Sequence, residues 1–234
     1  MESPRVSVVI PTRNEEAAIG RVLNEVVAAL GSLGNYEILV VDTDSRDRTR
    51  EIAAAHGARI VPEPRRGYGR AYKTGFREAR GEIIATLDAD LTYPPHEIPA
   101  FVLLVGGGEA DFVSGNRLDL AGTPAMSGMH LVGNAFLNRA FRLLFRFPIR
   151  DSQSGMWVFR RSLLDRLELV HDGMAFSEEL KLEAIRNGAR FREVAIEYRE
   201  RVGEKKIRSV RDATANLVWL VRKRAGWVRP RTAD

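Results

Sequence analysis

Short runs of β-branched residues alternate with helix-like segments through the first half of this 234-residue chain. Residues 6–10 form an apolar run closed by Pro11, and residues 15–30 carry apolar side chains at the spacing of an amphipathic helix. The rhythm repeats, with strands expected at 36–41, 59–61, 82–87 and 111–114 and helices at 45–56, 69–79 and 95–105. Such alternation predicts an α/β fold with a mostly parallel sheet and helices on both faces.

The second half is less regular, and no internal repeat or low-complexity linker divides the chain. The pattern predicts helices at 130–147, 176–186 and 209–224 and strands at 156–159 and 191–198. Gly122 and Pro124 mark the change between the halves. We therefore predict a single domain over 1–234, made of a first half at 1–120, a second half at 121–200 and a basic segment at 201–234.

The composition is that of a soluble globular protein, with 44% hydrophobic and 29% charged residues. The chain has no cysteine, which excludes disulfides, a thiolate nucleophile and a cysteine zinc site. The start runs directly into a strand pattern, so no secretory signal is expected. The longest stretch without charge, 120–138, is interrupted by glycines and a proline, so any membrane contact is expected to be peripheral.

The net charge of +5 is concentrated near the end of the chain. Residues 201–231 hold ten Lys and Arg side chains against only Glu204 and Asp212. A lipid headgroup surface and a solvated helix face are both compatible with this pattern. Nucleic acid is not expected as a partner, because no recognition motif accompanies the charge.

Four loops rich in polar residues and glycine follow predicted strands, at 11–15, 42–47, 64–69 and 88–92. The carboxyl ends of parallel strands share one edge of a sheet, and ligands of such sheets bind outside that edge. These loops are therefore expected to form a common rim.

The loop at 88–92 begins with Asp88-Ala89-Asp90, directly after an apolar strand. Strand side chains two residues apart point the same way, so the two carboxylates are expected to converge. Hard oxygen ligands suit Mg²⁺ or Mn²⁺, which commonly take substrate phosphates as further ligands. Taken alone, the motif is also compatible with two solvated aspartates.

The other rim loops offer weaker signals. Asp42 could accept hydrogen bonds from a base or ribose, while Ser45 or Asp47 could cap the following helix. Gly67 and the glycine two residues later allow close backbone approach before a helix, and Lys73 adds positive charge for an anion. A plain glycine turn is the alternative.

In combination these loops resemble family 2 inverting glycosyltransferases of the GT-A fold. The resemblance rests on SVVIPTRNE at 7–15, DTDSRDRT at 42–49, GYGRAYKTG at 67–75 and DADLTYPP at 88–95, in matching order. It implies a Rossmann-like nucleotide-diphospho-sugar transferase domain with a mixed, mostly parallel sheet. VSGNR at 113–117, DSQSG at 151–155, FSEE at 176–179, EVAIEY at 193–198 and GEKK at 203–206 narrow it to polyprenyl-phosphate glycosyltransferases of the dolichyl-phosphate mannose synthase type.

The resemblance implies roles for individual residues. Asp88 and Asp90 would bind the metal and donor, with Asp90 the more direct ligand, and Glu179 would lie beside the reacting centre. Arg117 would meet the acceptor phosphate. The remaining implied donor contacts are Pro11, Arg13, Glu15, Asp42, Gly67, Lys73 and Ala89, and the further acceptor contacts are Ser154, His130 and Lys206.

The chain departs from the family pattern at several positions. Arg13 stands where the family often has tyrosine, Thr43 where a second aspartate is usual, and Thr92 where glutamine often follows the metal carboxylates. An acceptor-binding arginine expected near 127–130 is absent, and His130, Arg139 or Lys206 are candidates to replace it.

The implied reaction moves a hexose from a nucleotide sugar to a polyprenyl phosphate by one in-line displacement. A lipid monophosphate is ionised near pH 7 and needs no strong base, whereas a soluble hydroxyl acceptor would need Glu178, Glu179 or Asp151. UDP-glucose and UDP-N-acetylglucosamine are favoured, and GDP-mannose stays open. The alternatives are a soluble saccharide or natural-product acceptor and a non-catalytic nucleotide-sugar binding protein.

Two basic, apolar segments, 131–147 and 209–228, favour peripheral attachment to the inner face of a membrane and a cytoplasmic location. Core packing or a homodimer interface are the alternative uses of these surfaces.

Overall fold

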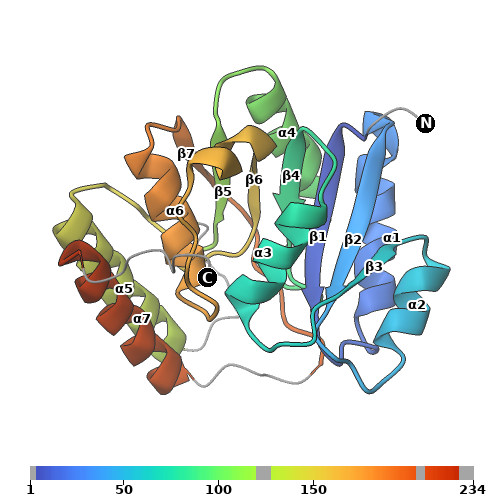
Figure 1. Cartoon of the computed structure of the whole chain (residues 1–234), viewed down its shortest axis with the longest axis horizontal. Coiled ribbons are helices and arrows are strands. Elements are labelled where there is room, and N and C mark those ends of the chain that lie inside the picture. Colours follow the sequence, from blue (N-terminus) through green and yellow to red (C-terminus); the bar gives the residue numbers. More distant parts are fainter. Residues whose placement is uncertain (1–3, 120–127, 204–208, 227–234) are drawn as a thin grey trace, which may run out of the picture.

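The computed structural model describes residues 4–119, 128–203 and 209–226, except for the side chains of residues 32, 128–130 and 209–212. A seven-stranded sheet crosses the molecule in the order β3-β2-β1-β4-β6-β5-β7, with helices on both faces (Figure 1). The strands are β1 Val6–Thr12, β2 Tyr36–Asp42, β3 Arg59–Pro62, β4 Ile83–Thr86, β5 Phe112–Asn116, β6 Trp157–Arg160 and β7 Phe191–Ala195. The helices are α1 Ile19–Leu30, α2 Thr49–Ala55, α3 Tyr68–Glu78, α4 Ile98–Gly106, α5 Gly128–Phe145, α6 Phe176–Arg186 and α7 Ser209–Arg224, with short 3₁₀ turns at 31–33, 95–97 and 161–166.

The sheet is mixed and mostly parallel, as predicted. The strands β1, β2, β3 and β4 run parallel to one another and β5 runs parallel to β7, while β6 runs antiparallel to both β4 and β5. Because of this reversal, the loop that precedes β6 lies at the same edge as the loop that follows β4. Residues 151–155 and residues 88–92 are thereby brought together.

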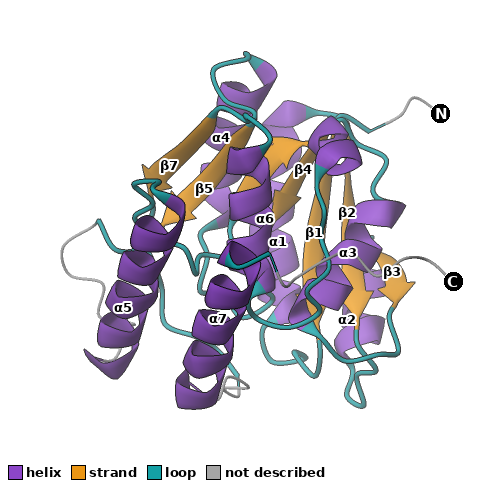
Figure 2. Ribbon diagram, turned by 60° about the vertical axis from the view of Figure 1, so that its left-hand side comes forward, coloured by secondary structure: helices purple, strands orange, loops and turns teal. Residues whose placement is uncertain are grey.

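Alternate residues of the central strands face two different cores. In β1, Val8 and Ile10 belong to the core beneath α1 and α4, whereas Val9 packs with Leu39 of β2 beneath α3 and α6. The third core joins α5 and α7 through Leu137, Phe141, Trp219 and Leu220. These two helices lie side by side and stand away from the sheet (Figure 2). No helix in the described ranges is long and apolar enough to cross a membrane.

Two expected element boundaries were wrong at the rim. Pro11 does not close the first strand, because β1 continues to Thr12; the ladder to β4 ends at Val9, so the missing proline N–H costs no bond there. The helix expected from residue 15 begins at Ile19. The backbone amide of Asn14 instead donates to the hydroxyl of Ser45, in the loop after β2, and that of Glu15 donates to the hydroxyl of Thr49, the first residue of α2.

The other boundaries differ less. α2 begins at Thr49 rather than residue 45, and Asp47 Oδ1 accepts the Thr49 amide at 3.0 Å, as a capping residue would. The helix expected from residue 95 opens with a 3₁₀ turn before α4, and β7 is three residues shorter than expected. The predicted rim therefore forms, with its loops more ordered by side-chain bonds than their composition indicates.

Candidate active site

The loops that follow β1, β2, β3 and β4 enclose a cavity of about 310 Å³ at the carboxyl edge of the sheet. The second half of the chain contributes two further wall residues. The lining consists of Pro11, Thr12, Arg13, Glu15, Thr43, Arg66, Gly67, Tyr68, Ala71, Asp88, Ala89, Asp90, Met174 and Arg201. Segments far apart in sequence thus meet at the predicted rim.

Asp90 is held from both sides of its carboxylate. Oδ1 accepts hydrogen bonds from the Thr92 amide at 3.1 Å and the Thr92 hydroxyl at 2.6 Å, and Oδ2 pairs with the Arg201 guanidinium at 2.5 Å. The Asp90 carbonyl also accepts the amide of Val202 at 3.0 Å. Asp90 is only 2% exposed, so the Arg201 cation offsets a carboxylate that burial would otherwise destabilise.

Asp88 lines the same cavity as Asp90. The hydroxyls of Tyr68 and Tyr72 lie 3.4 and 3.5 Å from its Oδ1. Burial raises the pKa of Asp88 to about 7, and the negative charge of Asp90 adds to the rise.

This donor set fits a divalent cation. Two hard carboxylates face one cavity, their charges oppose each other, and one of them already holds a cation from the chain. Within the described residues no group of three or more His, Asp and Glu side chains is arranged for a metal. A bound ion would therefore need oxygens of a ligand or water besides Asp88 and Asp90.

Arg117 directly follows β5 and forms a bidentate ion pair with Asp151. Nε lies 2.7 Å from Oδ2 and Nη2 lies 2.8 Å from Oδ1, and the Arg117 guanidinium also lies 5.1 Å from the ring centroid of Tyr198. Burial alone would raise the pKa of Asp151, but the charge and hydrogen bonds of Arg117 lower it. The pair anchors the loop at 151–155.

A buried lysine supports the same loop from α6. The Nζ of Lys181 donates to the carbonyl oxygens of Asp151, Ser152 and Ser154 at 2.8, 3.1 and 2.9 Å. Burial lowers the pKa of Lys181 to about 8, and one turn earlier burial raises the pKa of Glu178 to about 8. The loop is thus held by the buried ammonium of Lys181.

Glu179 stands behind the cavity wall rather than in it. Its carboxylate is fully buried and accepts the backbone amides of Val170 and His171 at 3.1 and 2.8 Å. Burial raises the pKa of Glu179, while the hydrogen bonds from those two amides lower it. In the described structure Glu179 therefore orders the segment that ends in Met174, a wall residue of the cavity.

Seven of the nine predicted donor contacts line the cavity: Pro11, Arg13, Glu15, Gly67, Asp88, Ala89 and Asp90. Asp42 lies just below it, where its Oδ1 accepts the Ser45 amide at 3.1 Å. Lys73 points away into a separate groove and pairs with Asp172 at 2.7 Å.

The structure describes two of the four predicted acceptor side chains, Arg117 and Ser154. Arg117 and Ser154 are buried beside the cavity, and neither lines it among the described residues. Lys206 lies outside the described residues, and the side chain of His130 is likewise not described. Their roles stay predictions.

Seven wall residues were not among the predicted contacts: Thr12, Thr43, Arg66, Tyr68, Ala71, Met174 and Arg201. Tyr68 was visible as the middle residue of the glycine motif, and Arg201 as the first residue of the basic segment. Nothing in the local pattern of Met174 signals a cavity, because its position depends on the segment ordered by Glu179.

Known proteins of one family are similar to this chain. The model of the family described as Glycosyl transferase family 2 matches residues 7–168. A low-salt glycan biosynthesis hexosyltransferase of Haloferax volcanii is 35% identical over 228 residues, covering 97% of this chain and 55% of the relative. A dolichyl-phosphate hexose transferase of the same organism is 36% identical over 202 residues, covering 86% of each. The chain therefore spans about half the length of the first relative and most of the second.

Among solved structures, glucosyl-3-phosphoglycerate synthase of Mycobacterium tuberculosis, in complex with Mn²⁺, UDP and phosphoglyceric acid, superposes with a TM-score of 0.74. The two are 23% identical, and the match covers 95% of this chain and 79% of that one. Another structure of that enzyme contains Mg²⁺ and UDP. At this identity the likeness shows the fold.

Proposed function

The chain belongs to glycosyl transferase family 2 and has the GT-A fold, and from that premise we propose that it transfers a hexose from a nucleotide sugar to a polyprenyl phosphate. The observation that carries the proposal is the rim cavity, where Asp88 and Asp90 face Arg13, Arg66 and Arg201. Paired carboxylates together with guanidinium groups suit a metal-bridged sugar diphosphate. The similarity to a dolichyl-phosphate hexose transferase supports a lipid phosphate as the acceptor class.

The donor half of the site follows from this chemistry. Asp88 and Asp90 would hold Mg²⁺ or Mn²⁺, and Arg13 and Arg66, which line the same cavity, would neutralise phosphate oxygens. When bound, the ion offsets the negative charge that develops on the leaving diphosphate. The hydroxyl of Tyr68 donates to Asp88 Oδ1 at 3.4 Å and so orients this carboxylate.

The reaction is a single displacement with inversion. An oxygen of the acceptor phosphate forms a bond to the anomeric carbon while the bond from that carbon to the diphosphate breaks. The acceptor oxygen is already ionised near pH 7, so the protein supplies positioning and charge neutralisation rather than a base. Arg117, held by Asp151, and the 151–155 loop define the acceptor side.

Peripheral membrane attachment follows from the surface of α5 and α7. Among the described residues, six of the eight exposed large hydrophobic side chains lie on these two helices: Leu131, Val132, Phe136, Leu143, Val218 and Val221. Arg139, Arg142 and Arg222 are exposed on the same helices. Apolar and basic side chains in one place suit the headgroup layer at the inner face of a membrane.

A transfer assay tests the function. The purified chain is incubated with Mn²⁺, polyprenyl phosphate and radiolabelled UDP-glucose, UDP-N-acetylglucosamine or GDP-mannose, and the lipid is extracted into organic solvent. We expect label from one donor in the organic phase, and its loss in Asp90→Asn. Label that appears only in water-soluble product when saccharides or phosphoglycerate are supplied would replace the lipid acceptor with a soluble one, and donor binding without transfer to any acceptor would leave a binding protein.

A further inference from the structure

The loop at 151–155 reaches the carboxylate of Asp88 at its last residue. A Cβ added at Gly155 would lie 3.6 Å from Asp88 Oδ1 and would clash with the hydroxyl of Tyr68. The backbone amide of Gly155 donates to the Tyr93 hydroxyl at 2.7 Å. Under the proposed function, the course of this loop therefore sets how much room an acceptor has opposite Asp88.

Side chains from other elements hold the backbone of this loop and of the residue before it. The amides of Arg150 and Asp151 donate to the two carboxylate oxygens of Glu193 on β7, both at 2.8 Å. Three carbonyl oxygens of the loop accept Lys181 Nζ from α6. The course of the loop therefore depends on where those distant elements pack.

Asn138 of α5 holds the middle of the loop with both ends of its side-chain amide. Its Oδ1 accepts the amide of Ser152 at 2.8 Å, and its Nδ2 donates to the carbonyl of Arg150 at 2.6 Å. Asn138 is only 2% exposed, whereas Phe136 and Arg139 beside it on the helix are exposed. A buried amide that satisfies one backbone donor and one backbone acceptor fixes the loop to α5.

Asn216 of α7 holds the next residue of the loop. Its Nδ2 donates to Gln153 Oε1 at 2.8 Å, and Gln153 Nε2 donates in turn to the hydroxyl of Ser152 at 3.2 Å. Asn216 is 4% exposed, although Val218 on the same helix is exposed. The two helices lie side by side (Figure 2), and each directs one buried asparagine to adjacent residues of the loop.

We propose that Asn138 and Asn216 are positioning residues of the acceptor side, which makes α5 and α7 part of the site as well as a surface for attachment. The two side chains hold the loop so that Gly155 stays beside Asp88. This role rests on the proposed function, because it requires an acceptor opposite Asp88. The described lining of the donor cavity includes no residue of the loop, α5 or α7, so donor binding is not expected to change.

Steady-state transfer to citronellyl phosphate, a water-soluble isoprenyl phosphate, tests the proposal without vesicles. In Asn138→Ala and in Asn216→Ala, the KM for citronellyl phosphate is expected to rise about three- to tenfold, the effect of one lost hydrogen bond. The KM for the nucleotide sugar should keep its wild-type value, which also shows that each variant is folded. A general loss of structure would instead change both KM values.

A double-mutant cycle isolates the contact between Asn216 and Gln153. Gln153→Ala is expected to raise the acceptor KM as much as Asn216→Ala does, and the double variant no further, because both changes remove the same hydrogen bond. Additive effects would show that the two side chains act separately and would overturn the role of Asn216. The cycle also keeps the proposal testable if Asn138→Ala does not fold.

Amide exchange observes the loop without any transfer. In Asn138→Ala, hydrogen–deuterium exchange of the peptide that contains Ser152, followed by mass spectrometry, is expected to be about tenfold faster, because the amide loses its partner. Unchanged exchange would overturn the role of Asn138. A wild-type chain that labels no lipid phosphate would overturn the proposed function, so the two failures are separate results.

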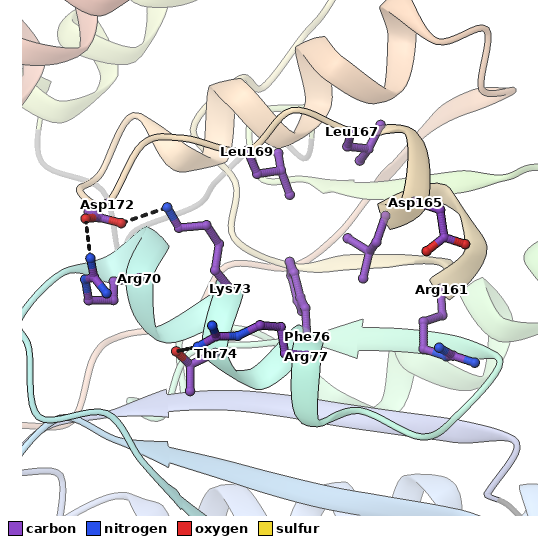
Figure 3. Close-up of a pocket in the computed structure, with 11 residues that line it drawn as sticks. Arg70, Lys73, Thr74, Phe76, Arg77, Arg161, Asp165, Leu167, Leu169 and Asp172 are labelled. Atoms are coloured by element: carbon purple, nitrogen blue, oxygen red, sulfur yellow. Dashed lines mark hydrogen bonds and ion pairs between the residues drawn. The ribbon is translucent and has the colours of Figure 1, made fainter. Parts of the chain in front are cut away.

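Two control variants should behave like wild type in both measurements. Asn24→Ala removes the same group from an exposed position on α1. Arg77→Ala removes a side-chain hydrogen bond of 3.0 Å to the hydroxyl of Thr74, which lies within α3 (Figure 3). An acceptor KM that rises equally in the controls, or that stays at the wild-type value in Asn138→Ala and Asn216→Ala, would overturn the proposal.

Discussion

The carboxylate of Asp90 is shared between two partners from distant parts of the chain. Thr92, where the family often has glutamine, satisfies Oδ1, and Arg201 satisfies Oδ2. A divalent ion at Asp90 therefore competes with a guanidinium that the protein itself supplies. When that ion carries a diphosphate, Arg201 is already next to the phosphates that it would neutralise.

This competition makes Mn²⁺ affinity sensitive to Arg201. Replacing Arg201 with glutamine is expected to tighten Mn²⁺ binding about three- to tenfold in the absence of donor, the equivalent of about 1 kcal/mol for a partly exposed ion pair. Electron paramagnetic resonance of free Mn²⁺ measures this directly. Arg199→Gln removes the same charge from the same segment, but its partners are Glu25 and Glu197, so it should bind Mn²⁺ like wild type. Weaker Mn²⁺ binding by Arg201→Gln would contradict the competition.

Glu178 predicts a pH dependence of stability. Its pKa is about 8 in the folded chain against an ordinary value of 4.5, so between these pH values the folded state keeps a proton that the unfolded state releases. The free energy of unfolding should therefore fall as pH rises from 5 to 7.5, by at most about 1.4 kcal/mol per pH unit. Lys181, whose pKa is lowered to about 8, acts in the opposite direction only above that pH.

Urea unfolding of Glu178→Gln over the same pH range tests this assignment. The variant should decline less steeply than wild type, because it loses the contribution of Glu178 and keeps that of Asp88, whose pKa is also raised. Glu168→Gln, at an exposed site, should decline like wild type. Parallel profiles for wild type and Glu178→Gln would show that Glu178 is ionised in the folded chain.

At the scale of elements, α3 is pressed unusually close to the sheet. A Cβ added at Gly75 would lie 2.4 Å from Cγ1 of Val9 on β1 and 2.8 Å from Cγ2 of Val41 on β2. The near approach lets one helix carry Tyr68 and Ala71 into the cavity and Lys73 into the separate groove (Figure 3).

Gly75→Ala is therefore expected to lower the free energy of unfolding by about 1–3 kcal/mol, as overpacking of a core does. Gly133→Ala provides the matched control, because a Cβ at that position of α5 meets no atom within 4 Å. There alanine should stabilise by about 0.5–1 kcal/mol through helix propensity. Urea unfolding of both variants separates the two effects, and a neutral Gly75→Ala would mean that α3 can move outward.

The helices α5 and α7 carry the prediction on membrane binding. Changing Val132, Phe136 and Leu143 together to serine should reduce flotation with anionic vesicles at least tenfold, because each large apolar side chain contributes about 1.5–3 kcal/mol when buried. Val27 and Leu103 are also exposed but lie on α1 and α4, so their change to serine should leave flotation unchanged. Equal flotation of both variants would remove α5 from the membrane contact.

For the whole molecule, binding of the donor at the rim loops should raise the free energy of unfolding. A nucleotide sugar with Mn²⁺ at about one hundred times its dissociation constant stabilises the folded state by about 2.7 kcal/mol. For a chain of this size that raises the melting temperature by about 5–10 °C. The nucleotide sugar that gives the largest shift identifies the donor, and Asp90→Asn should abolish the Mn²⁺-dependent part.

Much of the fold was predictable because its signals are local. Apolar periodicity located the strands and helices, and strand ends located the rim on which Asp88 and Asp90 meet Arg13. The ion pair between Arg117 and Asp151 left no such signal, because its partners are 34 residues apart in the sequence. They come together only because β6, which follows Asp151, pairs antiparallel with β5, which precedes Arg117. Arg201 escaped prediction for the same reason, since its partner Asp90 lies 111 positions earlier.

Because β6 runs antiparallel, the loop at 151–155 can change its length independently of the forward strands. Loops of the forward strands reach the rim after their strands end, whereas the loop at 151–155 reaches it before β6 begins. A longer or shorter 151–155 loop therefore alters what stands opposite the carboxylates without shifting the register of β1, β2 or β4. Under the proposed function, exchange of this one segment between relatives would change the acceptor and leave the donor side unaltered.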